Sequence, residues 1–345
     1  MNESPVLYDY AADDTGLWVF PVGAANPNKV WQSGRGNWTW GKSKLAAGVL
    51  RGEAGTEAVR EICALYDYSN DDTGLWVLPT DGSNPVKVWQ SGRGNWAWGK
   101  SKVIGADIRG IGYPEVCVLY DYGNDGSGLF VFPAGEASPS PADLGRWQDA
   151  RGQQTWGNSK FAAADVLGKG NLELAFLYNY GGDDTALLVC PAGEFNNPQI
   201  IFQLNPEIIS PGPTQVWKSG RGNWDWGKSK VIGADVRGTG TPELCVLYDY
   251  GNNDTGLWVF PSAGAAPIKV WQSGRGNWTW GNSKLLVADI HGTGKLELAV
   301  LYNYGGDDTG LWVFPAGEFN PTKVWQSGRG NWAWRLSKVP SDDDN

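Results

Sequence analysis

Histidine is nearly missing from this chain of 345 residues, in which His291 is the single example. One histidine excludes a metal site with several histidine ligands and leaves little for catalysis by Ser-His-Asp or Cys-His groups. Cysteine is scarce as well, with four residues. The chain therefore has few of the side chains on which metal and nucleophilic chemistry depend.

Long apolar runs and an excess of positive charge are also absent. No run approaches the roughly 20 residues of a membrane-spanning helix, so no membrane insertion is expected. The 28 basic and 37 acidic residues give a net charge of −9, which disfavours nucleic acid as a partner because phosphate neutralisation supplies most of that affinity. The first residues, Met1 to Pro5, show no signal peptide, and we expect synthesis in the reducing cytoplasm. The final compartment is left open, including release by a route that uses no signal peptide.

Glycine and tryptophan are abundant instead, with 49 and 21 residues, and hydrophobic residues make up 41% of the chain. Such a composition predicts a folded protein with a substantial core. The tryptophans recur at regular intervals, and internal repeats of this kind are the signature of repeat architectures.

Two strings of residues recur along the chain. Leu-Tyr-Asp/Asn-Tyr occurs six times, with its first tyrosine at Tyr8, Tyr66, Tyr120, Tyr178, Tyr248 and Tyr302. Trp-Gln/Lys-Ser-Gly-Arg-Gly-Asn-Trp-x-Trp begins at Trp31, Trp89, Trp217, Trp271 and Trp325, with a degraded copy at Trp147. The tyrosine steps are 58, 54, 58, 70 and 54 residues, and the longest contains a proline-rich insertion at 196–213, predicted to be a surface loop.

Each module reads as four short strands, such as Ser101–Asp107, Glu115–Tyr122, Gly256–Pro261 and Lys269–Ser273, separated by glycine- and asparagine-rich turns. Four strands per repeat of this length are typical of β-propeller blades. The chain opens on a second strand, Val6–Tyr10, and closes on a first strand, Ser337–Val339.

This phase predicts an all-β, six-bladed β-propeller of four-stranded blades, whose C-terminal strand pairs with the N-terminal strands. We expect one domain over 1–345, with a disordered tail at 340–345. A linear array of sheets is the alternative, but it would leave two unpaired edges.

The four cysteines fit this architecture. Cys63, Cys117 and Cys245 occupy one position in the second strand, where other modules carry alanine, and Cys190 stands where other modules carry phenylalanine. These positions favour small or apolar buried residues, so all four are predicted to be free thiols in the core.

Four strings resemble the repeats of bacterial and fungal propeller lectins, the Photorhabdus-type fucose-binding lectins, and more distantly FG-GAP or VCBS-like repeats. They are SGRGNWTWGKSK, AD-x-x-G-x-G-x-x-EL, VLYDYGN and TGLWVF. The resemblance covers nearly the whole chain. It implies a lectin that binds fucose-like or O-methylated sugars in pockets between blades. The family members have seven blades, whereas six are predicted here.

The calcium loop of FG-GAP repeats is not retained. Where those repeats carry inner carboxylates, this chain has Arg109 and Ile111 between Asp107 and Glu115. A cation would lose most of its oxygen ligands there. We therefore expect neither a metal nor a cofactor, and interpret the pattern as turn geometry.

A sugar site needs an aromatic plate and rigid donors and acceptors, and the Gly-Arg-Gly-Asn-Trp loop contains all of them. The first and last tryptophans of the motif persist in all six modules, which favours core packing. The middle one is Gln154 in the third module, which favours ligand contact. The candidate sugar-binding residues of this loop are Arg35, Asn37, Trp38, Arg93, Asn95, Trp96, Arg221, Asn223, Trp224, Arg275, Asn277, Trp278, Arg329, Asn331 and Trp332.

The tryptophan of the third strand completes the candidate set, as Trp18, Trp76, Trp258 and Trp312. It is replaced by Phe130 and Leu188 in two modules. Because Leu188 lies in the module that the Gln154 loop enters, the two losses coincide, as expected for one silent pocket. About five working pockets are predicted, with the blade at 159–191 silent.

The leading prediction is a multivalent lectin whose partners are fucosylated or methylated glycans and glycoconjugates, because several weak pockets on one ring raise avidity. A protein-interaction scaffold, with tryptophan-rich loops as hot spots, is the alternative. An enzyme such as a glycosidase is disfavoured, because catalysis would need one site rather than many near-identical loops. Homo-oligomerisation is left open by the sequence.

Overall fold

The computed structural model describes residues 4–23, 26–48, 50, 61–123, 126–136, 139–147, 156–193, 213–261 and 265–340. The insertion predicted at 196–213 lies outside these residues except for its last position, and the tail predicted at 340–345 lies outside them except for its first. Gln153 and Gln154 of the degraded loop also lie outside the described residues.

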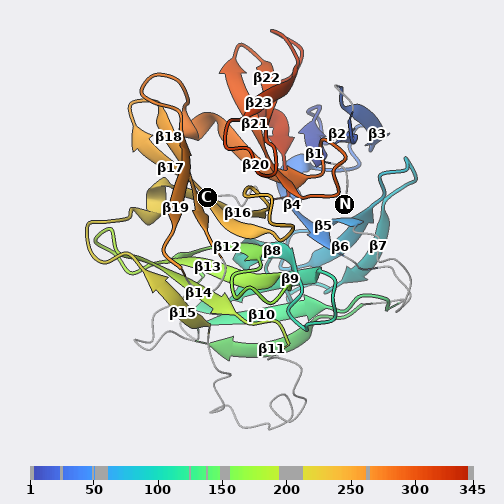
Figure 1. Ribbon diagram of the computed structural model, residues 1–345. Coiled ribbons are helices and arrows are strands. Elements are labelled where there is room, and N and C mark those ends of the chain that lie inside the picture. The colour runs from blue at the N-terminus through green and yellow to red at the C-terminus, as the bar shows by residue number, and fades with distance from the viewer. Residues whose placement is uncertain are drawn as a thin grey trace.

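Six four-stranded antiparallel sheets form a ring around a central axis, as predicted (Figure 1). Each sheet is one blade, named here by its place in the ring. From the innermost to the outermost strand, blade 1 is β24 (Ser337–Lys338), β1 (Ser4–Asp9), β2 (Thr15–Phe20) and β3 (Asn28–Gln32); blade 2 is β4 (Ser43–Gly48), β5 (Glu61–Asp67), β6 (Thr73–Leu78) and β7 (Val86–Gln90); blade 3 is β8 (Ser101–Ala106), β9 (Glu115–Asp121), β10 (Ser127–Phe132) and β11 (Ala142–Trp147).

In the second half of the chain, blade 4 is β12 (Ser159–Ala164), β13 (Glu173–Asn179), β14 (Thr185–Cys190) and β15 (Thr214–Lys218); blade 5 is β16 (Ser229–Ala234), β17 (Glu243–Gly251), β18 (Asp254–Phe260) and β19 (Ile268–Gln272); blade 6 is β20 (Ser283–Ala288), β21 (Glu297–Gly305), β22 (Asp308–Phe314) and β23 (Thr322–Gln326). No helix in the described part of the chain combines the length and apolarity needed to cross a membrane.

The ring closes where the two ends of the chain meet. Strand β24 pairs antiparallel with β1, with Lys338 opposite Leu7 and Ser337 opposite Tyr8. Blade 1 is therefore assembled from both ends of the chain, which confirms the predicted closure and gives the innermost edge of β1 a partner.

The core lies between the blades rather than within any one of them. Side chains alternate between the two faces of a strand, and each face of a blade is covered by its neighbour. One buried cluster, for example, joins Cys63 and Leu75 of blade 2 to Val116 and Phe132 of blade 3. Both faces being buried explains why the second and third strands read as nearly continuous apolar runs.

A lysine of each innermost strand links one blade to the next. In blade 2, the Lys44 ammonium donates to the backbone oxygens of Trp98 at 3.1 Å and Ser101 at 2.5 Å, and lies 4.2 Å from the Trp98 ring centroid. The other five members of this set, here called the interblade lysines, make corresponding contacts: Lys102, Lys160, Lys230, Lys284 and Lys338. Charge-assisted hydrogen bonds of this kind are the stronger ones in proteins.

All four cysteines are free and buried, which confirms the prediction from the sequence. Burial raises the pKa of the Cys117 and Cys245 thiols, and the nearby carboxylates of Glu115 and Glu243 add to the effect. Thiols held in the protonated form in this way are poor nucleophiles.

The Asp-x-x-Gly-x-Gly segments form turns, as expected. The Asp107 carboxylate accepts hydrogen bonds from the backbone nitrogens of Ile111 and Gly112, both at 2.8 Å. Arg109 pairs with the buried Glu115. Among the described residues, no group of three or more His, Cys, Asp and Glu side chains is arranged to hold a metal ion.

Candidate functional site

The Gly-Arg-Gly-Asn-Trp loop connects the outermost strand of one blade to the innermost strand of the next. In the loop between β3 and β4, Gly34 and Gly36 adopt φ values of 77° and 79°, which an L-residue rarely adopts. The loop folds onto the β1–β2 turn, where the nitrogens of Asn37 and Trp38 both donate to the Asp13 oxygen, at 3.1 and 3.0 Å.

The middle tryptophan of the motif is buried, so the prediction that it is displayed to a ligand is wrong. The exposed fraction of Trp38 is 5% and that of Trp96 is 7%. The Trp38 indole nitrogen donates to the Ser43 hydroxyl at 2.8 Å, which satisfies its only donor. The same burial and hydrogen bond are found at Trp96, Trp224, Trp278 and Trp332.

Each middle indole packs against two aromatic side chains of the blade that its loop enters. Trp38 meets Tyr66 and Trp76 of blade 2, with centroids 4.7 and 5.2 Å apart. The middle indole and the third-strand tryptophan are therefore packing partners. Because the two tryptophans pack against each other, the loss of one favours the loss of the other. Packing thus explains why Gln154 and Leu188 replace the middle and the third-strand tryptophan together.

Apart from Trp147, whose side chain lies outside the described part of the molecule, the first and last tryptophans of the motif are half-buried and structural, as the sequence indicated. Trp31 packs edge-on against Trp38, with centroids 5.7 Å apart. The Trp98 indole nitrogen donates to the Leu65 oxygen at 2.8 Å and so ties its loop back to blade 2. All three tryptophans of the motif therefore hold adjacent blades together.

The loop arginines and asparagines lie on the surface. Arg35, Arg93, Arg221, Arg275 and Arg329 are exposed, as are Asn37, Asn95, Asn223, Asn277 and Asn331. The asparagine amide groups shape the loop, because Asn37 Nδ2 donates to the Ser33 oxygen at 2.9 Å and its counterparts do the same. The arginine side chains are thus the part of the loop that is presented to solvent.

A second aromatic group remains accessible, on the outer part of the blades. In blade 1, the Trp18 indole nitrogen donates to the Tyr10 hydroxyl at 2.9 Å, and 37% of Tyr10 is exposed. The register places Trp18 opposite Lys29 and Gly16 opposite Gln32, so these side chains share one face with Tyr10. We call this group of tyrosine, tryptophan, lysine and glutamine the outer aromatic site.

Three further blades carry a complete outer aromatic site. The indole nitrogen donates to the tyrosine hydroxyl at 3.0 Å in blade 2, 2.9 Å in blade 5 and 2.7 Å in blade 6. Their residues are Tyr68, Trp76, Lys87 and Gln90; Tyr250, Trp258, Lys269 and Gln272; and Tyr304, Trp312, Lys323 and Gln326.

A glycine lets the tyrosine lie flat on the strand. A Cβ built onto Gly16 would meet Tyr10 Cε2 at 2.6 Å, closer than any real Cβ contact. Burial of this ring raises the pKa of Tyr10, and the hydrogen bond from Trp18 offsets the rise only in part. The tyrosine therefore stays protonated at neutral pH and its hydroxyl hydrogen remains available as a donor.

The polar part of the site is anchored on a buried carboxylate. The Lys29 ammonium lies 5.4 Å from the Tyr10 ring centroid and donates to Gln32 Oε1 at 2.7 Å. Gln32 Nε2 in turn donates to Asp14 Oδ2 at 2.7 Å, and Asp14 is buried. This chain of hydrogen bonds fixes the exposed lysine and glutamine beside the aromatic pair.

Blades 3 and 4 depart from this arrangement. In blade 3, Tyr122 lies beside Phe130, which has no indole N–H. In blade 4, Leu188 replaces the tryptophan, and the Lys218 ammonium lies 4.4 Å from the Tyr180 centroid and 3.1 Å from Asp184 Oδ2. The number of complete sites is therefore four, compared with about five pockets expected from the sequence.

The structure thus brings together residues that sequence reasoning did not connect. Of the predicted candidates, Trp18, Trp76, Trp258 and Trp312 belong to the outer aromatic sites. The second tyrosine and the lysine and glutamine of the fourth strand were missed. Their signal was present, because Tyr-x-Tyr places both rings on one face and Lys-Val-Trp-Gln recurs in four modules.

No protein-family model and no curated protein sequence matches this chain. Among solved structures, it is similar to a lectin from Aleuria aurantia in complex with Fucα1-6GlcNAc, with 13% identity, 93% of this chain and 94% of that chain covered, and a TM-score of 0.46. It is also similar to AofleA from Arthrobotrys oligospora, with 11% identity, 93% and 86% coverage and a TM-score of 0.47.

A further similarity is to a putative 6-phosphogluconolactonase from Bacteroides fragilis, with 10% identity, 94% and 97% coverage and a TM-score of 0.44. Similarities this distant concern the propeller fold, and include both lectins and proteins named as enzymes.

Proposed function

We propose that the protein is a multivalent carbohydrate-binding protein whose outer aromatic sites each bind one sugar unit, with fucose-like or O-methylated saccharides as the class. The observation that carries this proposal is a repeated arrangement on four blades, in which a tryptophan backs a tyrosine and an anchored lysine and glutamine flank it. The tyrosine is exposed in blades 1, 5 and 6 and half-buried in blade 2. Aromatic faces take the C–H face of a pyranose, and polar groups fixed beside them take its hydroxyls.

Repetition itself favours binding over catalysis. Single shallow sites bind weakly, whereas several on one ring raise the effective concentration of sites at a glycan-coated surface, by about 10²–10⁴ in avidity. The exposed loop arginines, Arg35 and its four counterparts, are proposed as additional contacts. The buried middle tryptophans are no longer candidates for contact.

The test is binding on a glycan array, followed by calorimetric titration with the best free saccharide. We expect about four equivalents of sugar per chain, and free sugar should inhibit agglutination of cells bearing that glycan. A broad array without binding, or a single site per chain, would contradict the proposal.

A matched pair of variants locates the sites. Replacement of Tyr10, Tyr68, Tyr250 and Tyr304 together by alanine should abolish agglutination, because it removes the tyrosine ring from every complete site. Tyr180→Ala in blade 4 is the control and should leave agglutination unchanged. Binding of a protein partner that no saccharide inhibits would instead support an interaction scaffold.

A further inference from the structure

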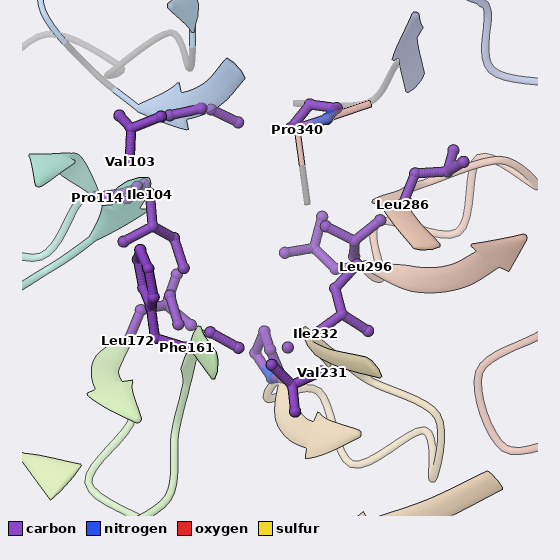
Figure 2. A pocket seen from close by; sticks show the side chains of 18 of the residues that line it. Val103, Ile104, Pro114, Phe161, Leu172, Val231, Ile232, Leu286, Leu296 and Pro340 are labelled. Carbon is purple, nitrogen blue, oxygen red and sulfur yellow. The ribbon is translucent and has the colours of Figure 1, made fainter. Parts of the chain in front are cut away.

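The axis of the propeller encloses a second and different kind of site. A cavity of about 110 Å³ is lined by the innermost strands β4, β8, β12, β16 and β20 together with Pro5 and Pro340. Figure 2 shows Ile104, Phe161, Ile232 and Leu286 arranged around one open space. None of the described residues that line this cavity has a polar side chain, so the axis is an apolar channel.

Close contacts between the innermost strands hold the wall of the channel in place. A Cβ built onto Gly105 would lie 1.7 Å from the Ala47 oxygen, and one on Gly233 would lie 1.8 Å from the Ala163 oxygen. Strands β4 and β8, and likewise β12 and β16, therefore approach as closely as their backbones allow. A wall fixed in this way defines the channel before any ligand enters.

One end of the channel widens into a polar mouth. This hollow, of about 370 Å³, shares Pro114, Leu172, Pro242 and Leu296 with the channel, so the two adjoin at these four residues. Its described lining adds the carboxylates of Asp107, Asp165 and Asp235 and the ammonium of Lys295.

The carboxylates at the mouth are held in fixed positions by the turns. Asp165 accepts from the nitrogens of Lys169 and Gly170, at 2.8 and 3.0 Å, and Asp107 and Asp235 are held in the same way. Each carboxylate has about four acceptor positions, so two remain at Asp107 and Asp165. One remains at Asp235, because the Thr239 hydroxyl also donates to it at 3.3 Å. The Lys295 ammonium donates to the Gly238 oxygen at 3.2 Å. The described lining of the mouth carries three carboxylates and one ammonium, which is an excess of negative charge.

We propose that the channel and its mouth bind a primary alkylammonium ion with a short unbranched chain. The chain occupies the apolar channel, where its methylenes leave water. The ammonium group lies at the mouth, where its three donors and its positive charge complement the carboxylates. Branched chains and aromatic rings are disfavoured, because the channel is smaller than the ~150 Å³ cavity known to take benzene.

Chain length and charge provide the test on the unmodified protein. Calorimetric titration with propyl-, butyl-, pentyl- and hexylammonium should show the dissociation constant falling by about fourfold for each added methylene until the channel is full. The alkanol of equal length should bind at least tenfold more weakly, and the alkanoate more weakly still. Added salt should weaken binding of the ammonium ion and leave that of the alkanol unchanged.

Methyl-group NMR locates the ligand. Butylammonium should shift the methyl signals of Ile104, Ile232 and Leu286 and leave those of valines on the outer strands in place. Asp165→Asn should weaken binding of butylammonium severalfold without affecting butanol, and Ile232→Phe should weaken both by narrowing the channel.

Circular dichroism melts confirm that each variant is folded before it is titrated. The proposal is overturned if alkanoates bind as well as alkylammonium ions, if affinity does not depend on chain length, or if no member of the wild-type series binds.

Discussion

Blade 2 and blade 4 have the same four-stranded frame but different outer faces. Both pair their strands in one register, and in both an interblade lysine reaches the next blade, Lys44 from blade 2 and Lys160 from blade 4. On the outer face, blade 2 presents Tyr68 against Trp76, whereas blade 4 has Tyr180 and Leu188.

The differences in blade 4 form a connected set. Lysine and glutamine exchange places, so that Lys87 and Gln90 of blade 2 correspond to Gln215 and Lys218. Lys218 then pairs directly with Asp184, whereas in blade 2 Gln90 lies between the lysine and Asp72. The strand pairing and the interblade lysine are thus the same in both blades, whereas several residues of the outer face differ together. The inner strands and the outer face of a blade can therefore change independently.

The largest effect is expected when blade 2 is given the residues of blade 4. Trp38→Gln should lower the free energy of unfolding by about 3–5 kcal/mol, because it removes a buried indole and leaves a cavity. Trp76→Leu should cost less, because Trp76 is only half-buried. In urea unfolding, the double variant should be less destabilised than the sum of the two by about 0.5–3 kcal/mol, because the residues are in contact. Additive costs would show that the joint loss in blade 4 is unrelated to packing.

The interblade lysines should show no difference between the two blades. Lys44→Met and Lys160→Met should each lower the free energy of unfolding by about 2–3 kcal/mol, because each removes charge-assisted hydrogen bonds to buried carbonyls. Equal costs in denaturant unfolding are the expected result. A much smaller cost in blade 4 would show that its divergence extends to the inner frame.

A smaller effect is expected at Gly74, the glycine beneath the Tyr68 ring. Gly74→Ala places a methyl group 2.6 Å from Tyr68 Cε2, and the clash should cost about 1–3 kcal/mol. If the outer aromatic sites bind sugar, the same variant should reduce the stoichiometry from about four to about three. The reverse change in blade 4, Ala186→Gly, should cost about 0.5–1 kcal/mol and leave the stoichiometry unchanged.

The smallest effect concerns a buried carboxylate of blade 4. Leu167 stands where blade 3 has Arg109, so the ion pair of blade 3 has no counterpart at Glu173. Within the described part of the chain, Glu173 Oε1 has no hydrogen-bond partner. Burial raises the pKa of Glu173. The folded state therefore holds this proton more tightly than the unfolded state, so stability falls as pH rises from the ordinary glutamate range through the raised pKa.

Glu173→Gln should accordingly stabilise the protein by about 1 kcal/mol at neutral pH, with no gain below the ordinary pKa of glutamate. Thermal melts across that range give the measurement. Glu115→Gln in blade 3 is the control and should destabilise, because it breaks the ion pair with Arg109. A gain for Glu173→Gln that persists at low pH would assign the effect to packing instead of charge.

The fold was predictable from the sequence because repeats report on architecture directly. Six copies of Leu-Tyr-Asp/Asn-Tyr gave the number of blades, and the phase of Val6–Tyr10 against Ser337–Val339 gave the closure. The equivalence of Cys63 with alanine in other modules correctly indicated a buried thiol.

The site was less accessible to sequence reasoning. The absence of tryptophan at position 154 resembled the loss of a ligand contact, but a packing pair that changes jointly with Leu188 produces the same pattern. The contact between Trp38 and Trp76, at an interface where both tryptophans are present, favours the packing explanation over loss of a ligand contact. The sequence alone does not show this contact. The outer aromatic site also depends on the register of the fourth strand, which shifts between Leu17 and Trp18 through an irregularity that the sequence does not mark.

Closure of the ring in blade 1 joins residues that are synthesised far apart in time. Tyr8 precedes Ala333 by 325 residues, yet its hydroxyl accepts from the Ala333 nitrogen, and Lys338 donates to the Ser43 oxygen. The inner edge of β1 therefore stays unpaired in the nascent chain until Ser337 and Lys338 have left the ribosome. Blade 1 can be completed, and the ring closed, only after that. A nascent chain that stops before that stretch leaves the inner edge of β1 without its partner strand.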